Sequence, residues 1–504
     1  MDPTMRTAFL RIEEWPPLAW LAVCRKTDSE VTVVHGPQVE TTDEWFCEAV
    51  WAGDYEEGGF DATDIVAGSG GRLRDREIIF VSSGSTVDRL VYWQSDKILL
   101  VSNSIACLLA VANASAMVTY PRYWYDFCTI VSGLKRYKTD LPTSIGRLHL
   151  LYFDNLSWDG QELHVVPKSK PRRDFGDFER YHGFLSESMH AVATNLASPA
   201  RKSPYRMLCT VSSGYDSPCV AVIARSAACA EAICIDTARD GSPENGAAIA
   251  EHLGMRAYVI SRDGWREFAF PQVPFIAADC TGEAVSLQSA ISHLHGRVLF
   301  TGNYGGVIWG KHPPDLGESI VRGDTSGLSH CEFRLWQGYI QCAVPFWGAR
   351  QIRDVNQITL SSDLGEWDVS GAYSRPIPRR IVETAGVPRG MFGVRKRATA
   401  IFVSEFFTPD AMEDYFAWLK RHRWDWIKRG RLPPIRHDAF DCWLARMIGD
   451  LEHLKHLPVL WRLARDAPMN NPFLLRAYVF PWAIEHAKKR YQSSAQFRTV
   501  QALL

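Results

Sequence analysis

The sequence predicts a mixed α/β protein. A β-rich domain, residues 1–165, precedes a domain built on a doubly wound parallel sheet, residues 175–504, which ends in a helical region. The length of 504 residues is about three to four times that of a typical domain. Before residue 165, short β-branched and aromatic runs alternate with turn residues. From Met207 onward, strand-like runs alternate with helical segments, the pattern of a parallel sheet with crossover helices.

Composition and charge narrow the class of protein. Hydrophobic residues make up 46% and charged residues 22% of the chain, which is typical of globular proteins. Lys and Arg number 56 against 57 for Asp and Glu, so no net charge attracts nucleic acid or an anionic membrane. No apolar run approaches the ~20 residues that span a bilayer, and residues 1–4 lack a leader pattern. We therefore expect a soluble, cytoplasmic protein without a membrane or nucleic-acid partner.

The cysteines and histidines argue against disulfides and transition metals. The 12 cysteines form no C-x-x-C pair, and several lie in apolar runs, as buried cysteines of a reducing compartment do. The 15 histidines show neither H-x-x-x-H nor H-E-x-x-H spacing. A catalytic transition-metal site is therefore not expected.

Four runs of the N-terminal domain have the composition of strands. They are rich in β-branched and aromatic residues and are separated by Gly, Ser, Asn and Asp. The runs are residues 31–34, 78–81, 90–93 and 98–101. The last two form a predicted hairpin through residues 94–97, followed by a short helix near residues 105–112.

A basic, proline-punctuated stretch at residues 167–174 suits a linker. Helical spacing follows at residues 178–196. The sheet pattern then has strands from 207, at 232–236 and at 256–261, with helices at 219–228 and 246–253 between them. Further helical segments are predicted at 402–407, 411–421, 439–454 and 474–491.

The segment from Ser212 to Ser217 has the features of a phosphate-binding loop. An apolar strand precedes it, Gly214 permits close backbone approach, and Ser212, Ser213 and Ser217 supply hydroxyl donors. Pro218 fits the first turn of the next helix, whose N-terminus would face an anion. On spacing alone, an ordinary structural helix cap explains the segment about equally well.

Asp216 favours the phosphate interpretation. A carboxylate beside a phosphate loop is repulsive unless a cation such as Mg²⁺ bridges the two, so Asp216 is a predicted magnesium ligand. Asp236, Asp240 and Glu244 follow the next strand, at the sheet edge where doubly wound proteins bind ligands. Each is either a ligand contact or, more commonly, a turn or helix-start residue.

These motifs resemble a known family. Residues 211–217, V-S-S-G-Y-D-S, resemble the S-G-G-x-D-S loop of the adenylating, pyrophosphate-releasing synthetase domain shared by asparagine synthetase B, β-lactam synthetase and lasso-peptide cyclases. Residues 299–306, L-F-T-G-N-Y-G-G, resemble the family's S-G-x-G-x-D-E strand and loop. Residues 344–347, V-P-F-W, resemble its V-P-F-L element, and residues 387–397 resemble the segment that carries a late basic residue.

The resemblance implies an ATP-pyrophosphatase domain that uses ATP and Mg²⁺. The implied nucleotide contacts are Ser212, Ser213, Gly214, Tyr215, Asp216, Ser217, Asp236 and Gly302. It also implies a glutaminase-like N-terminal domain, most clearly at residues 90–106.

The chain departs from the glutamine-hydrolysing members at its N-terminus. Those enzymes expose a cysteine nucleophile at the mature N-terminus, whereas Asp2, Pro3 and Thr4 stand there in this chain. Cys24 lies in an apolar run and lacks activation by its own α-amine. The N-terminal domain is therefore expected to be a degenerate glutaminase, and glutamine is not the expected nitrogen source.

The two loops depart as well. Ser213 stands where the family usually has glycine, so either the turn differs or the position is not strictly left-handed. The acidic pair of the second loop falls on Gly306 and Val307, which removes one implied metal ligand. Asp216 would then hold Mg²⁺ together with water and phosphate oxygens.

Basic residues complete the expected site. The resemblance gives Lys396, or its neighbour Arg395, a catalytic electrostatic role toward the α-phosphate and the leaving pyrophosphate. A solvated charged surface is the other interpretation of this run. Arg375, Arg379 and Arg380 are second candidates, for bidentate recognition of a carboxylate.

The expected function is that of an ATP-dependent, amide-forming ligase. It would adenylate a small-molecule or peptide carboxylate for attack by an amine, without glutamine hydrolysis. The alternative is a non-catalytic nucleotide-binding scaffold of the same fold, motivated by Gly306 and Val307. A nucleic-acid substrate is a third possibility, against which the neutral net charge weighs.

Overall fold

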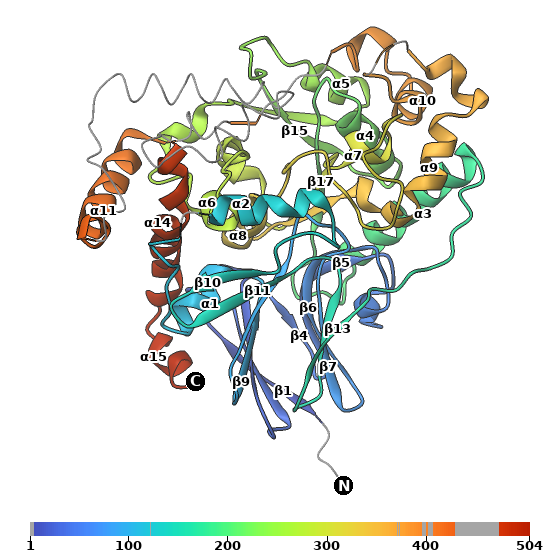
Figure 1. The fold of residues 1–504 in the computed structure, drawn as a ribbon. Helices are drawn as coiled ribbons and strands as arrows, with labels where there is room; N and C mark the ends of the chain where they lie inside the picture. The colour runs from blue at the N-terminus through green and yellow to red at the C-terminus, as the bar shows by residue number, and fades with distance from the viewer. Residues whose placement is uncertain are drawn as a thin grey trace.

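A computed structural model describes residues 5–120, 122–369, 371, 373–395, 400–401, 407–428 and 473–504. Within them, a β-rich N-terminal region lies at one end of the molecule, and a parallel sheet with its helices lies at the other (Figure 1). The predicted mixed α/β class is confirmed at this level.

Two sheets, antiparallel except where β1 pairs with β3, make up the N-terminal region. The larger one has the order β1-β3-β2-β9-β8-β11-β10. Its strands are β1 Arg6–Arg11, β2 Trp20–Arg25, β3 Glu30–His35, β8 Leu90–Gln94, β9 Ile98–Ser102, β10 Asp140–Thr143 and β11 Gly146–Leu151. The smaller one has the order β13-β12-β7-β6-β5-β4. Its strands are β4 Glu40–Thr41, β5 Trp45–Trp51, β6 Val66–Arg74, β7 Glu77–Val81, β12 Asn155–Trp158 and β13 Leu163–Val166.

Alternation along the strands packs these two sheets against each other. Trp20, Ala22 and Cys24 of β2 belong to a buried cluster that also contains residues of β5, β7 and β12. Leu21 and Val23 point to the other face, into the main core that includes the whole of α1, Ile105–Val111. The predicted hairpin is confirmed, because β8 and β9 pair antiparallel.

The second sheet is fully parallel and has the order β16-β15-β14-β17-β18. Its strands are β14 Arg206–Thr210, β15 Glu231–Ile235, β16 Arg256–Ile260, β17 Arg297–Thr301 and β18 Ile340–Ala343. The chain moves outward from β14 to β16 and then returns to the other side of β14. The order therefore reverses between β14 and β17, which is where sheets of this type bind ligands.

Two helices connect the first three of these strands, as predicted: α4 Asp216–Ser226 and α5 Gly246–His252. The start of α4 differs from the predicted residue 219. Cys219 N already donates to Tyr215 O at 3.2 Å, and Pro218 is tolerated because the first turn needs no amide donor.

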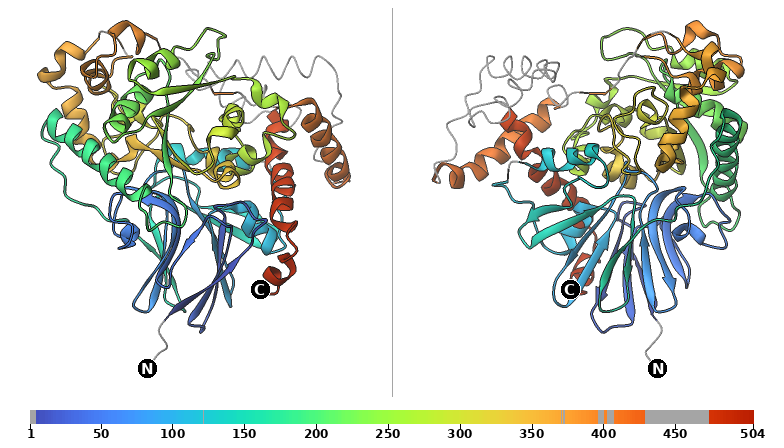
Figure 2. Two further views of the ribbon diagram at one scale, coloured as in Figure 1. Left: turned by 180° about the vertical axis from the view of Figure 1, so that it is seen from behind. Right: turned by 45° about the vertical axis from the view of Figure 1, so that its right-hand side comes forward.

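The remaining helices surround the parallel sheet and one side of the molecule. They are α2 Tyr123–Cys128, α3 Phe178–Leu196, α6 Val273–Asp279, α7 Gly305–Ile308, α8 His330–Gln337, α9 Ile352–Thr359, α10 Pro376–Thr384, α11 Pro409–Lys428, α14 Phe473–Gln492 and α15 Phe497–Gln501. Figure 2 shows α14 and α15 running down the side of the N-terminal region. The predicted helices at 178–196, 411–421 and 474–491 lie within α3, α11 and α14. Residues 402–406 and 439–454 lie outside the described residues.

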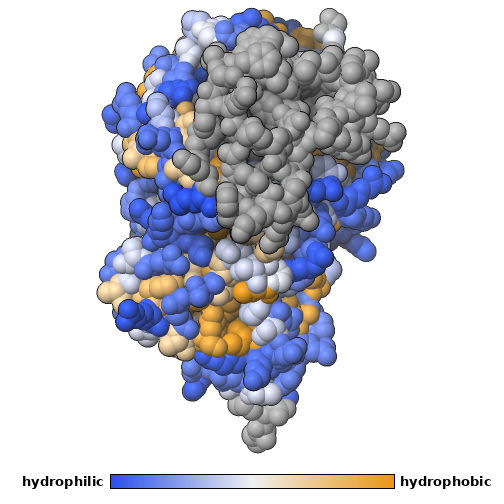
Figure 3. All heavy atoms as spheres, turned by 60° about the vertical axis from the view of Figure 1, so that its left-hand side comes forward, coloured by the Kyte–Doolittle hydropathy of each residue, from blue (hydrophilic) through white to orange (hydrophobic). Residues whose placement is uncertain are grey.

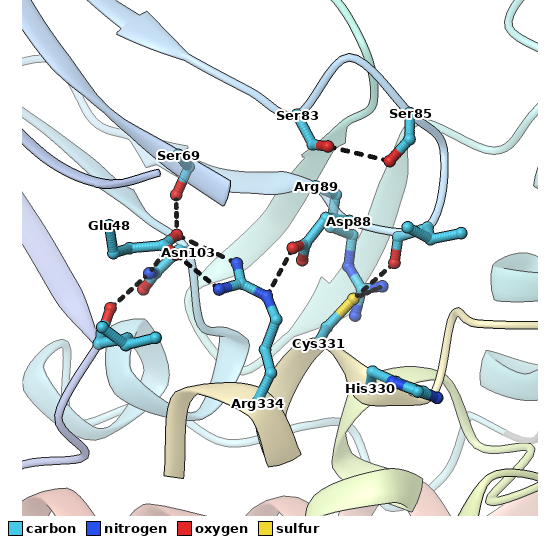
Figure 4. Close-up of polar contacts among 12 residues, drawn as sticks. Glu48, Ser69, Ser83, Ser85, Asp88, Arg89, Asn103, His330, Cys331 and Arg334 are labelled. Carbon is cyan, nitrogen blue, oxygen red and sulfur yellow. Dashed lines mark hydrogen bonds and ion pairs between the residues drawn. The ribbon is translucent and has the colours of Figure 1, made fainter. Parts of the chain in front are cut away.

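Buried charges join the two regions of the chain (Figure 4). Arg334 of α8 donates to Glu48 Oε2 of β5 at 2.6 Å and lies 2.5 Å from Asp88 Oδ2. Ser69 and Asn103 also donate to Glu48. Because burial without this pairing is costly for every member, the cluster holds α8 against the N-terminal sheets.

The predicted linker at 167–174 is anchored rather than extended. Lys168 is 2% exposed, and its Nζ donates to Ser82 O at 2.9 Å and to Asn155 Oδ1 at 2.8 Å. Burial lowers the pKa of Lys168 to about 7. Arg173 then forms a bidentate pair with Asp64, at 2.8 Å for one contact. Lys168 and Arg173 of this stretch are thus used in packing, whereas Lys170 and Arg172 are exposed.

The described residues show a mainly hydrophilic face in Figure 3 and mostly buried cysteines. In the described part of the chain, no helix has the length and apolar character needed to cross a membrane. The face drawn in Figure 3 is mainly hydrophilic, with a patch of hydrophobic residues below the grey atoms. The described cysteines other than Cys128 are buried. Burial raises the pKa of the Cys24 thiol, so it is a poor nucleophile, in line with the expectation from the sequence.

Candidate functional site

The loop after β14 is closed by its own serines. The Ser212 amide donates to Ser217 Oγ at 2.9 Å, and the two hydroxyl oxygens lie 2.8 Å apart. The Ser213 amide donates to Glu244 Oε1 at 2.6 Å. Ser213 does not have a positive φ, so a side chain fits where the resembling enzymes usually have glycine.

Glycines bring the second loop against the first. A Cβ on Gly302 would lie 2.7 Å from the carbonyl carbon of Asp216, and one on Gly305 would lie 2.6 Å from its Cγ. Only glycine therefore allows the chain after β17 to contact the start of α4. Between them, Tyr304 has φ 76°, a left-handed conformation that costs a non-glycine residue free energy.

Asp216 forms an ion pair with Arg375, which lies just before α10. Arg375 Nη1 donates to Asp216 Oδ1 at 2.6 Å and also to Oδ2. The side chain of Arg375 is 13% exposed and that of Asp216 is 23% exposed. A Cβ on Gly306 would lie 2.9 Å from Arg375 Nη2, so the glycine leaves room for the guanidinium. The predicted metal ligand thus contacts a cation supplied by the chain.

Both loops open on one cavity of about 360 Å³ at the reversal of strand order. Six residues predicted to contact the nucleotide line it: Ser212, Gly214, Tyr215, Asp216, Ser217 and Gly302. Arg375 also borders the cavity, from the other side of Asp216. The phosphate-loop residues and the second glycine loop are therefore brought together, as expected from their positions after β14 and β17.

Two predicted nucleotide contacts do not line this cavity. Ser213 is buried behind the loop against Glu244. Asp236 Oδ1 accepts from Thr237 Oγ1 and from the Arg262 amide, both at 3.0 Å. Its carboxylate joins the ends of β15 and β16, which is the turn role that the sequence left open.

Of the basic residues that the sequence singled out, some lie at the cavity and others do not. Arg395 is exposed and contacts Ser242 Oγ at 3.1 Å and Asp240 Oδ2 at 3.5 Å, and it does not line the cavity. Lys396 lies outside the described residues. Arg379 donates to Glu383 and to Tyr215 Oη, and Arg380 pairs with an exposed glutamate of α3. Of the arginines singled out, Arg375 alone contacts both loops in the described structure.

Sequence reasoning missed several charged residues of the cavity wall, among them Glu283 and Arg322. Burial, with Asp279 and Asp324 nearby, raises the pKa of Glu283 to about 8. Burial lowers the pKa of Arg322, which donates to Thr86 O of the N-terminal region at 3.0 Å. Neither residue belongs to a recognisable motif, and both reach the cavity through contacts distant in sequence.

The cavity presents polar atoms suited to a polar ligand. Within the described residues, Thr301 Oγ1, Tyr304 Oη and Glu283 Oε1 are buried and have no hydrogen-bond partner. Buried polar atoms normally have one, so a bound ligand or water would satisfy them. Together with the serine hydroxyls and Arg375, these atoms could hold a polar, anionic ligand.

The same residues do not fit a magnesium ion. Among the described residues, no three His, Cys, Asp or Glu side chains gather as a metal site, so a magnesium ion here would depend on Asp216, water and phosphate oxygens. Both oxygens of Asp216 already accept from Arg375, and Mg²⁺ requires near-octahedral oxygen ligands at about 2.0–2.1 Å. Asp216 as a magnesium ligand stays a prediction that this ion pair opposes.

No protein-family model matches the chain, and no curated protein matches it.

Proposed function

We propose that the chain is an ATP-dependent carbon–nitrogen ligase. A substrate carboxylate would bond to the α-phosphorus of ATP as the bond to the pyrophosphate breaks. An amine would then attack the acyl carbon and release AMP. The carboxylate and the amine would be small molecules or parts of a peptide, without glutamine as the nitrogen donor.

One observation carries this proposal. The serine loop after β14 and the glycine loop after β17 meet at the reversal of strand order, and both line the same cavity. That edge of a parallel sheet is the general ligand site of such folds, and a helix begins there, at Asp216. The resemblance of both loops to an adenylating family adds the reaction class.

The cavity residues would play different roles in this reaction, according to their chemistry. The Ser212 and Ser217 hydroxyls can donate to phosphate oxygens, and Arg375 supplies positive charge where negative charge collects in phosphoryl-group chemistry. Glu283 borders the same cavity and keeps its proton at neutral pH, because burial raises its pKa to about 8. It can accept the proton that the attacking amine loses only in its ionised form, whose share rises as the pH approaches 8.

The test is pyrophosphate release from ATP with a panel of carboxylates and amines. We expect release that depends on the carboxylate and that is lost in the double variant Asp216→Asn, Ser217→Ala. Release of ADP and phosphate instead would refute adenylation. A variant of the same type away from the cavity, Ser494→Ala beside Glu14, is the control for stability.

A second candidate is a nucleotide-binding scaffold without turnover. The pairing of Asp216 with Arg375 and the glycine at 306 favour it, because they remove the usual place for catalytic magnesium. ATP binding by calorimetry without products for any substrate pair would identify this function. Turnover with one pair would exclude it.

A further inference from the structure

The charge at the start of α4 is balanced within the chain. A carboxylate at a phosphate site repels a polyanion, and some cation must compensate. In this structure the cation is Arg375, which contacts both oxygens of Asp216 through Nη1.

From this contact we propose that Arg375 takes the place of the divalent cation, so that the cavity binds the nucleotide without Mg²⁺. This inference deepens the proposed function and depends on it. It names free ATP, rather than its magnesium complex, as the ligand.

The arginine is held in place from three sides. Pro376, whose ring fixes the backbone at the start of α10, directly follows it. The rings of Tyr215 and Tyr373 lie 5.9 and 5.5 Å from its guanidinium carbon, within the range of cation–π attraction. Because its side chain is only 13% exposed, moving it into solvent would break these contacts and leave the Asp216 charge half-buried.

Gly306 is the matching feature on the second loop. Any side chain there would begin 2.9 Å from Arg375 Nη2, closer than van der Waals contact permits. An acidic residue at 306 would require the guanidinium to move from this position. The glycine and the arginine therefore form one arrangement, in which a side chain with a fixed charge occupies the space of a second metal ligand.

The guanidinium also retains donors for the ligand. Arg375 lines the cavity, and within the described residues its hydrogen bonds all come from Nη1. Its remaining N–H groups can donate to a phosphate in the planar geometry that arginine offers. Asp216 thus orients the arginine, and the arginine contacts the phosphates.

The test measures ATP affinity by titration calorimetry in EDTA and in excess Mg²⁺. We expect dissociation constants that agree within about twofold, and a loss of about tenfold to a hundredfold in Arg375→Met, the size of a charge-assisted hydrogen bond. The double variant Arg375→Met, Asp216→Asn removes both charges and covers the case in which the single variant does not fold. The matched control, Arg389→Met, removes an exposed guanidinium that pairs with Glu383 and does not line the cavity, and it should bind normally.

Each outcome is decisive. Binding that requires Mg²⁺, or unchanged binding in Arg375→Met and in the double variant, would overturn the inference while leaving the proposed function intact. Failure of ATP to bind in either medium would overturn the proposed function itself.

Discussion

Replacing Glu283 by glutamine should stabilise the protein near neutral pH and not in acid. Burial raises the pKa of Glu283 from 4.5 to about 8. Between these values the unfolded chain has lost the proton and the folded protein keeps it, so folding binds a proton. Stability therefore falls as pH rises from about 4.5 to 8, because the folded state binds more protons than the unfolded state. Glutamine is nearly isosteric and has no such dependence.

The magnitude follows from the pH interval. At about 1.4 kcal/mol per pH unit, the interval from pH 4.5 to 7 corresponds to about 3.5 kcal/mol. Because the side chain borders the cavity, we reduce the expected gain at pH 7 to about 2 kcal/mol. Thr325 Oγ1, which donates to Glu283 Oε2 at 3.1 Å, can still donate to the amide oxygen of the variant.

Urea unfolding of both proteins at several values between pH 4.5 and 8 measures this effect. The difference in the free energy of unfolding should be near zero at pH 4.5 and reach about 2 kcal/mol at pH 7. Glu187→Gln, on the exposed face of α3, is the control and should show no such trend. An equal gain at both pH values, or a loss at pH 7, would refute the assigned protonation of Glu283.

Three further predictions concern packing. Because burial lowers the pKa of Lys168 to about 7, the unfolded chain binds a proton between pH 7 and 10 that the folded protein lacks. The free energy of unfolding should therefore rise over this pH range. Lys168→Met should flatten that rise, as measured by thermal melts. Arg334→Met should lower the free energy of urea unfolding by about 3–5 kcal/mol, because Glu48 is left buried without its partner. Gly246→Ala should weaken ATP binding in calorimetry and cost about 1–3 kcal/mol of stability, since its Cβ would lie 2.2 Å from Val211 O.

Local patterns were enough to predict much of the fold. The hairpin of β8 and β9, the helix α3 and the alternation from β14 to β16 follow from composition and spacing within short segments. The predicted start of α4, residue 219, was three residues late, because the helix already begins at Asp216 and its first turn, which needs no amide donor, includes Pro218.

The site was only partly predictable. The serine loop and Gly302 could be predicted as cavity residues because glycine and serine, placed directly after a strand, are typical of loops that bind phosphate. The partners Arg375 and Glu283 were not assigned these roles, since they reach the cavity from segments far away in sequence. Lys168 shows the same limit: its sequence suits an exposed linker, and its burial depends on Ser82 and Asn155, which only the tertiary structure brings to it.

The most direct test of the account is a crystal structure with a non-hydrolysable ATP analogue, with a methylene between the α- and β-phosphorus atoms. We predict that the phosphates of the analogue lie between the Ser212 to Ser217 loop and Arg375, in the cavity between β14 and β17. A nucleotide bound elsewhere, or none at saturating concentration, would contradict it.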